Sequence, residues 1–436
     1  MGPEGIEPRT SEAIMRKIRA AVGDAVGNMP LADVHTHLGA QEGRRQARTL
    51  ADLVSYHWLH LELVRAGADV PQELAGKDPS AYLRGMAPFF SRIRNTSNHF
   101  CFSGMLRDLY GLDGRTLTPE NWQDLDQRVR EKGGDPGWVA QVLDRAKVRK
   151  LMIATCDRRP EDPERFVPYA YGEYLFAPTT KGRLKQLGAG DPPSVPDAEA
   201  LGSLIRAEIA RLANGQGVRA LHVWIRDTWQ YTDYTDEDVS DLVRQVAAGA
   251  TLDAKDEDRL ISFCADTAAD AAGEHGMPVQ LFHGMWHYHR QGPSGQGVSS
   301  FWHAGFLRCL PVLAARHPRT LFDVFLGTRI PSHEMASLAR TANNLTVSGG
   351  WWHGFTPSTL KTFFRDRLEL LPHTVWNAFF SDGYIVEWIY AKSLLTRNCL
   401  SRALAEMVDE GYLTIEDALD MAARLLYENA TTLYGM

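Results

Sequence analysis

The sequence is poor in cysteine, and the cysteines it has are not arranged in pairs. Only five occur among 436 residues, and no two of them form a CxxC pair. An odd number of scattered cysteines argues against a disulfide framework and indicates a reducing compartment. The five are Cys101, Cys156, Cys264, Cys309 and Cys399.

Long apolar runs are also missing. No stretch approaches the roughly 18 apolar residues that a membrane-spanning helix needs. Residues 1–29 mix glutamate, arginine and lysine and contain no apolar core of signal-peptide length. We therefore expect a cytoplasmic protein that has no membrane partner.

Positive charge is not in excess. The formal net charge is -7 and the isoelectric point is near 6.1, so the chain lacks the basic surface with which proteins bind nucleic acids or anionic membranes. We expect a small-molecule substrate instead. With 44% hydrophobic and 23% charged residues, the composition is that of a globular protein with a substantial core.

What the chain does have is an alternation of apolar, β-rich segments with helical patterns, which is typical of βα repeats around a parallel sheet. Seven such segments are visible, and we expect an eighth strand between His37 and Leu151. This number favours an α/β fold, a (β/α)8 TIM barrel over residues 1–436 as a single domain, rather than a doubly wound open sheet. The segments are residues 31–37, 150–155, 219–225, 278–283, 321–326, 344–348 and 375–381.

Two regions depart from the alternation. Residues 50–67 and 119–132 have helical patterns, so we expect an α-helical insertion at about residues 50–135, after the first strand. Residues 290–300 (RQGPSGQGVSS) directly follow a predicted strand and its histidines. An active-site lid and a solvated connector both fit this composition.

The first predicted strand ends in two histidines with one residue between them. Residues 31–37 read Leu-Ala-Asp-Val-His-Thr-His, with His35 and His37 at the end. Side chains at i and i+2 of a strand leave the same face, so both imidazoles are expected to point into one cavity. Two neutral imidazoles make half of a divalent-metal site. Taken alone, such a pair at a strand edge is more often two solvated histidines than a metal site.

Two more potential ligands stand at the ends of other predicted strands. His283 ends the fourth segment and Asp382 follows the last. Because the carboxyl ends of barrel strands open on one face, we predict that His35, His37, His283 and Asp382 bind one divalent metal ion, zinc first and manganese as the alternative. Asp382 and His283 are also the predicted catalytic residues, with Asp382 as general base. Taken singly, His283 fits a buried histidine, and Asp382 before Gly383 fits a turn.

Aromatic and charged side chains gather at the same predicted rim. Such a wall favours an aromatic or flat organic substrate, although packing against a helical insertion explains the same composition. The predicted substrate-binding residues are Arg226, Trp286, His287, Tyr288, Trp351, Trp352 and Tyr384.

An HxH on strand one, a histidine that ends strand five and an aspartate that ends strand eight together resemble the amidohydrolase superfamily. The resemblance covers nearly the whole chain and implies a metal-dependent enzyme on a barrel. Residues 56–111, which begin YHWLHLELVRAG, resemble the helical segment that uronate isomerases insert after their first strand. Residues 371–388 (LPHTVWNAFFSDGYIVEW) look more like amidohydrolase-type hydrolases.

The departures from these families narrow what the resemblance implies. Uronate isomerases follow the strand-eight aspartate closely with an arginine that holds the sugar acid, and Gly383 and Tyr384 stand in that place here. Their RPD-type motif is absent near residues 171–178. Binuclear hydrolases carry a strand-four lysine, where this chain offers His222, and many members have a strand-six histidine, where residues 326–328 are Leu-Gly-Thr. One metal ion and a substrate other than a sugar acid are therefore expected.

These observations lead to a metal-dependent hydrolase that acts on a small organic substrate through a metal-activated water. Two alternatives use the same site: a uronate-isomerase-like conversion of an aldose to a ketose, and decarboxylation of an aromatic acid. A barrel that has lost catalysis and serves as a scaffold is a further hypothesis, against which the presence of all four ligand types argues. By analogy with barrels that pair through helical insertions, we expect a homo-oligomer.

Overall fold

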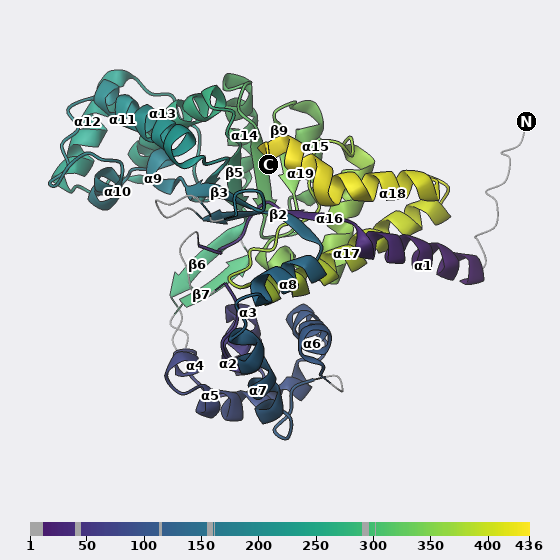
Figure 1. Cartoon of the computed structure of the whole chain (residues 1–436). Helices are drawn as coiled ribbons and strands as arrows, with labels where there is room; N and C mark the ends of the chain where they lie inside the picture. The colour runs from purple at the N-terminus through teal and green to yellow at the C-terminus, as the bar shows by residue number, and fades with distance from the viewer. Residues whose placement is uncertain are drawn as a thin grey trace, which may run out of the picture.

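A curled sheet of parallel strands forms the centre of the computed structural model (Figure 1). The structure describes residues 12–39, 45–112, 116–154, 160, 162–289, 296–300 and 302–436. Seven strands follow one another in the order β1-β2-β3-β4-β5-β8-β9, and every neighbouring pair is parallel. The α/β, TIM-like architecture is therefore confirmed. The strands are β1 (Leu31–Asp33), β2 (Val148–Ala154), β3 (Phe166–Tyr171), β4 (Leu221–Val223), β5 (Val279–His283), β8 (Phe322–Leu326) and β9 (Leu345–Ser348).

The strand that the sequence did not reveal is β3, and its expected position was wrong. We expected it between His37 and Leu151, where the described residues form helices and the start of β2. Instead β3 lies after β2, with Pro168 in its middle. Proline lacks the N–H that a ladder needs, so a proline-containing segment is an unlikely central strand by sequence. Its carbonyl still accepts the N–H of Arg219 at 2.9 Å, which ties β3 to the segment that leads into β4.

Residues 375–381, predicted as the last strand, close the circle without a regular ladder. The Gly349 N–H donates to Asn377 O at 2.8 Å on the β9 side, and the Asp382 N–H donates to His35 O at 3.0 Å on the β1 side. The segment therefore occupies the position of an eighth strand between β9 and β1. Its backbone bonds are too irregular for a strand because several of its donors bond elsewhere, such as the Ala378 N–H to Leu425 O at 2.9 Å.

Side chains along β5 alternate between the interior of the sheet and the surrounding helices. Phe282 belongs to the interior core, whereas Leu281 packs in the outer core. Gln280 also points inward, because its side-chain amide donates to Val34 O at 2.7 Å. By the period of two along a strand, His283 then points outward, and its ring stacks on Phe306 of α14 (Ala304–Arg316) at 3.9 Å.

Helices fill the long connection between β1 and β2. Figure 1 shows α2–α7 gathered in a lobe to one side of the strands, in the region where the helical insertion is predicted. The helices are α2 (Leu50–Val54), α3 (His57–Arg65), α4 (Leu74–Lys77), α5 (Pro79–Met86), η1 (Ala87–Arg92), α6 (Ser97–Tyr110), α7 (Trp122–Gly133) and α8 (Trp138–Arg145).

The remaining helices pack around the sheet. Those after β3 are α9 (Glu173–Phe176), α10 (Lys181–Gln186), α11 (Ala198–Ala210), η2 (Arg211–Gly215), α12 (Asp236–Ala248), α13 (Ala254–Glu274) and α14. The helix before β1 is α1 (Glu12–Asn28). The helices after β8 are α15 (Ser332–Thr341), η3 (Trp352–Gly354), α16 (Pro357–Leu370), α17 (Val386–Asp409), α18 (Ile415–Ala423), η4 (Arg424–Glu428) and α19 (Asn429–Tyr434). Within the described part of the chain, every helix is too short or too polar to span a bilayer.

A two-stranded hairpin follows β5 directly. Strand β6 (Met285–His289) pairs antiparallel with β7 (Gln296–Ser300), and the hairpin projects from the sheet (Figure 1). Part of the predicted loop 290–300 is therefore a strand, and residues 290–295 lie outside the described residues. The prediction of a lid stays a prediction.

Candidate metal centre

His35 is enclosed where β1 ends. Its side chain is fully buried, and its ring lies 4.8 Å from the rings of His222 and Phe282 and 4.9 Å from that of Tyr169. Among the described residues, neither ring nitrogen has a hydrogen-bond partner. Burial lowers the pKa of His35 to about 3, so the imidazole is neutral at pH 7 and retains a nitrogen lone pair for a ligand.

His37 lies next to it at the mouth of the sheet and is partly exposed. Its Nδ1 is 2.9 Å from the hydroxyl of Tyr171, and its ring stacks on Tyr384 at 4.5 Å. Its backbone N–H donates to Gly383 O at 2.9 Å. The two neighbours fix the ring so that Nε2 faces Asp382, at 3.0 Å from Oδ1.

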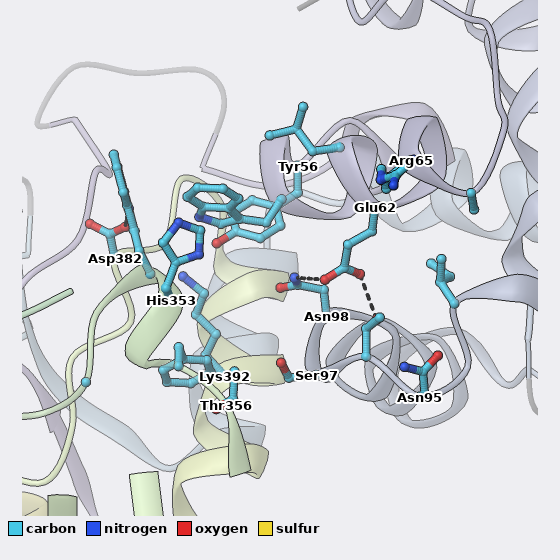
Figure 2. A pocket seen from close by; sticks show the side chains of 18 of the residues that line it. Tyr56, Glu62, Arg65, Asn95, Ser97, Asn98, His353, Thr356, Asp382 and Lys392 are labelled. Carbon is cyan, nitrogen blue, oxygen red and sulfur yellow. Dashed lines mark hydrogen bonds between the residues drawn. The ribbon is translucent and has the colours of Figure 1, made fainter. Parts of the chain in front are cut away.

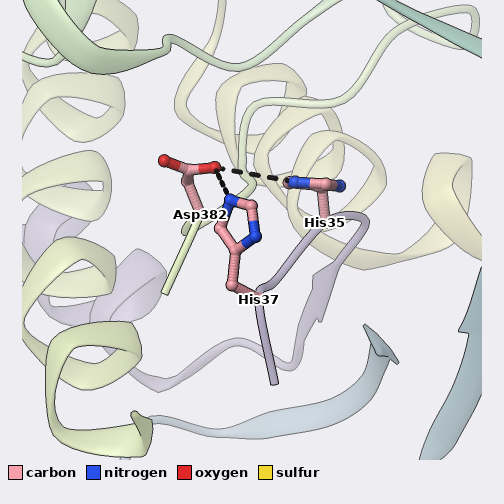
Figure 3. Close-up of side chains that lie close together, drawn as sticks. All are labelled: His35, His37 and Asp382. Carbon is pink, nitrogen blue, oxygen red and sulfur yellow. Dashed lines mark hydrogen bonds and ion pairs between the residues drawn. The ribbon is translucent and has the colours of Figure 1, made fainter. Parts of the chain in front are cut away.

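Asp382 completes the group from the closing segment (Figure 3). Its Oδ1 is 3.0 Å from His37 Nε2 and 3.6 Å from His35 Nε2, the latter too long for a hydrogen bond. Burial opposes the negative charge, but His37 and the other groups around it hold the pKa of Asp382 well below its usual value. The group therefore consists of one carboxylate and two imidazoles.

The donor set fits a divalent metal ion. One ligand atom from each of His35, His37 and Asp382 lies within 4.8 Å of the other two. Ligands about 2 Å from one ion stand at most about 4 Å apart, so a small side-chain adjustment would bring all three to one ion. The unpartnered nitrogens of His35 support the fit, because a fully buried polar atom without a partner is costly unless something binds it. Imidazole and carboxylate together suit zinc, manganese and iron.

The turn that carries Asp382 is held on several sides. Asp382 has a φ of +52°, a conformation that residues other than glycine seldom adopt. The preceding Ser381 donates its N–H to Asp33 Oδ1 at 2.9 Å, and its carbonyl accepts from the buried ammonium of Lys392 at 2.5 Å. These two hydrogen bonds hold the backbone of Ser381, and with it the turn that carries Asp382.

Asp382 lines two cavities. One, of about 560 Å³, is bounded mostly by polar and charged side chains, including Glu62, Asn98, His353 and Lys392 (Figure 2). The other, of about 650 Å³, is bounded largely by rings; seven of its sixteen described lining residues are aromatic: Tyr56, Trp58, Trp224, Trp351, Trp352, Tyr384 and Trp388. Both volumes are in the range of small-molecule sites.

The structure brings together three of the four predicted metal ligands and leaves the fourth apart. His283 is not part of the group formed by His35, His37 and Asp382. It points outward from β5, with Nδ1 2.6 Å from Oδ1 of Asp227. Its predicted roles as metal ligand and catalytic residue stay predictions.

The predicted substrate-binding residues separate into those at the cavities and those elsewhere. Trp351, Trp352 and Tyr384 line the aromatic cavity. Arg226 instead forms ion pairs with Glu257 at 3.3 Å and Asp258 at 2.5 Å, both on α13.

The other predictions concern the hairpin. Trp286 on β6 is 55% exposed. The side chains of His287 and Tyr288 lie outside the described part of the structure.

Several residues at the cavities were not predicted as site residues. Tyr56, His57 and Trp58 line the aromatic cavity from the start of α3, and burial lowers the pKa of His57 to about 4. Their signal in the sequence is the cluster Tyr-His-Trp at residues 56–58, inside the predicted insertion. A helix far from the strands in sequence gives no hint by itself that it covers the mouth of the barrel. Lys392 carries no recognisable motif at all.

No family model matches this chain, and no curated protein matches it in sequence. Solved structures do match it over nearly its whole length. A uronate isomerase of Thermotoga maritima aligns with a TM-score of 0.82 and 14% identity over 96% of this chain and 97% of its own. A glucuronate isomerase of Caulobacter crescentus aligns with a TM-score of 0.82 and 16% identity over 99% and 97%.

A third structure, from Lactobacillus casei and provisionally assigned as a metal-dependent hydrolase, aligns less closely. Its TM-score is 0.59 at 15% identity, over 95% of this chain and 97% of its own. The expected resemblance to amidohydrolase-type and uronate-isomerase barrels is thus confirmed at the level of the fold. Identities this low do not carry an activity from one chain to another.

Proposed function

We propose that this protein is a metal-dependent hydrolase that acts on a small organic substrate with a flat, apolar part. The observation that carries this proposal is the position of His35, His37 and Asp382 beside a cavity of about 650 Å³ with an aromatic lining. A divalent ion bound by these three side chains would supply Lewis acidity and a water nucleophile at neutral pH. We expect zinc, with manganese as the alternative.

The side chains of the protein would transfer the proton and bind the substrate. Asp382 is ionised and borders both cavities, so its carboxylate is placed to accept a proton from an attacking water and to deliver it to the leaving group. Trp224, Trp352 and Tyr384 offer ring faces and edges to the apolar part of the substrate. They also exclude water from the centre, which strengthens the electrostatic interactions there.

Isomerisation of a sugar acid is the second candidate, and the fold favours it. The two isomerases above align with this chain from end to end. Against it stands the turn after Asp382, where Gly383 and Tyr384 offer no cation for a sugar carboxylate.

A parallel assay separates these candidates. The purified protein, stripped of metal and reloaded with Zn²⁺ or Mn²⁺, is incubated with a panel of aryl esters, anilides and lactones, and separately with glucuronate and galacturonate followed by a ketose assay. We expect turnover in the first panel, and Asp382→Asn to lower it about 10²- to 10⁴-fold, the usual contribution of a general base. Asp266→Asn is the matched control, because Asp266 is also a buried aspartate beside a histidine, His317 at 2.8 Å, but lies on α13, outside the metal group.

The outcomes are distinct. Ketose formation without hydrolysis replaces the first candidate by the second. Full hydrolytic activity in Asp382→Asn contradicts the assignment of the site. If the wild-type protein binds neither metal ion, both candidates are wrong, and the scaffold hypothesis takes their place.

A further inference from the structure

The two oxygens of the Asp382 carboxylate have different neighbours. Oδ1 faces His35 and His37. Oδ2 accepts a hydrogen bond from the indole Nε1–H of Trp352 at 2.9 Å. The sequence predicts Trp352 as a wall for the substrate, but its only polar atom is engaged with the candidate metal ligand instead.

Both ends of this bond have an unusual backbone. Among the described residues, three that are not glycine have a positive φ, and two of them are Trp352 at +43° and Asp382 at +52°. Aspartate tolerates this region, but for a bulky residue it is a strained outlier. Residues kept in such conformations cluster at functional sites, because the surrounding structure must impose them.

Three neighbouring indoles pack against Trp352. Its ring centroid lies 4.6 Å from that of Trp351, 5.3 Å from that of Trp58 and 5.9 Å from that of Trp224. Trp58 belongs to α3, so the ring is gripped between the helical lobe and the barrel. An indole held in this way can aim its N–H at one point with little loss of entropy on bonding.

The neighbouring tryptophan shows that packing alone does not require this bond. Trp351 is 3% exposed and lies in the same aromatic cluster, 4.9 Å from Phe282. Its Nε1–H is buried and has no hydrogen-bond partner among the described residues. Of these two adjacent indoles, that of Trp352 has its N–H satisfied by the carboxylate of Asp382, and that of Trp351 does not.

We propose that Trp352 is a positioning residue that holds Oδ2 of Asp382 and thereby presents Oδ1, with one fixed orientation, to a metal ion shared with His35 and His37. The inference rests on the metal site of the proposed function. An indole N–H donates but neither accepts nor titrates over the physiological range, so it fixes one oxygen throughout that range. Partners of this kind around metal ligands typically contribute 10- to 100-fold in metal affinity.

The test compares the same substitution in two adjacent residues. Trp352→Phe and Trp351→Phe each remove one indole N–H and keep an aromatic ring in the same cluster. The affinity of the metal-stripped protein for Zn²⁺ and Co²⁺ is measured by competition with a chromophoric chelator, so no substrate is needed. We expect Trp352→Phe to weaken binding 10- to 100-fold and Trp351→Phe to change it less than threefold.

The visible spectrum of bound Co²⁺ adds a readout that a purely structural role would not alter. Its band positions and intensities depend on ligand geometry, so we expect them to change in Trp352→Phe at saturating Co²⁺ and not in Trp351→Phe. Equal affinities and spectra in the two variants overturn the role of Trp352 but leave the proposed function intact. Absence of metal binding by the wild-type protein overturns both.

Should Trp352→Phe fail to fold, the hydrogen bond is tested without changing the tryptophan. The chain has eleven tryptophans, and ¹⁵N labelling of their indoles gives one signal for each N–H. Asp382→Asn should shift at least one indole signal strongly, since a carboxylate acceptor becomes an amide. If every indole signal stays in place, the proposal is wrong.

Discussion

Replacing His35 with phenylalanine should make the metal-free protein more stable and, at the same time, abolish its stabilisation by metal. His35 is fully buried among rings, and neither of its nitrogens has a partner among the described residues. Each unsatisfied buried group costs about 1–3 kcal/mol, and phenylalanine removes both. The slightly larger ring costs about 1–3 kcal/mol in packing. We expect a net gain of about 2 kcal/mol in the free energy of unfolding without metal, from these two ranges.

Bound metal should make the wild-type protein more stable than His35→Phe. A ligand present at a hundred times its dissociation constant stabilises the native state by about 2.7 kcal/mol. The wild-type protein gains this amount and His35→Phe does not, because one of three ligands is lost. Urea unfolding followed by circular dichroism, once with EDTA and once with Zn²⁺, measures both quantities in each protein.

His60→Phe is the matched control. His60 is equally buried, on α3, but its Nδ1 is 2.9 Å from the hydroxyl of Tyr82. Its replacement leaves that hydroxyl without its partner and adds the packing cost of a larger ring, and together these outweigh the removal of one unpartnered nitrogen, Nε2. We expect a net loss of about 1–3 kcal/mol with and without metal. If His35→Phe is destabilised without metal as much as His60→Phe is, the unsatisfied nitrogens do not explain the site. If His35→Phe still gains stability from Zn²⁺, His35 is not a ligand.

Two further predictions concern the framework around the site. Burial opposes the charge of Asp266, but hydrogen bonds, the first from His317, lower its pKa to about 2 from 3.8. Asp266→Asn should therefore lower the free energy of unfolding by about 2 kcal/mol above pH 4. Urea unfolding at several pH values should show this difference from the wild-type protein fade between pH 4 and pH 2, and a constant difference contradicts the prediction. A Cβ on Gly349 (φ +48°) would lie 2.3 Å from a carbon of Phe380, whereas one on Gly188 (φ +89°) meets nothing within 4 Å. Gly349→Ala should thus lower the melting temperature and the metal affinity, whereas Gly188→Ala should cost only about 1 kcal/mol of backbone strain. Equal losses of melting temperature in the two variants would contradict the steric argument.

The sequence was sufficient for the fold class because most strands are short apolar runs between helical patterns. It failed where local chemistry hides a strand or imitates one. Pro168 hides β3, since proline is rare in central strands, although its carbonyl is used in the sheet. Residues 375–381 imitate a strand by their apolar composition, but their backbone bonds to several different partners instead of one ladder.

For the candidate site, the pattern of residues predicted the pair His35 and His37 and their meeting with Asp382. It did not predict that His283 points away from them. A strand end gives the position of a residue but not its face, and the face follows from the inward orientation of Phe282 one position earlier. Nothing in two adjacent tryptophans reveals which indole reaches Asp382, since that depends on the positive φ of Trp352.

The irregularity of the closing segment and the geometry of the site have one physical cause. A regular strand keeps φ near -120° in a parallel sheet, and in that conformation the residue after Ser381 would continue along the barrel wall. Asp382 at φ +52° instead turns its carboxylate back toward His35, whose carbonyl accepts the N–H of Asp382 at 3.0 Å. A glycine at position 382 would adopt this positive φ more easily but would supply no metal ligand. The ladder is therefore given up where the carboxylate is needed, and the side-chain bonds from Asp33, Lys392 and Trp352 hold the segment in its place.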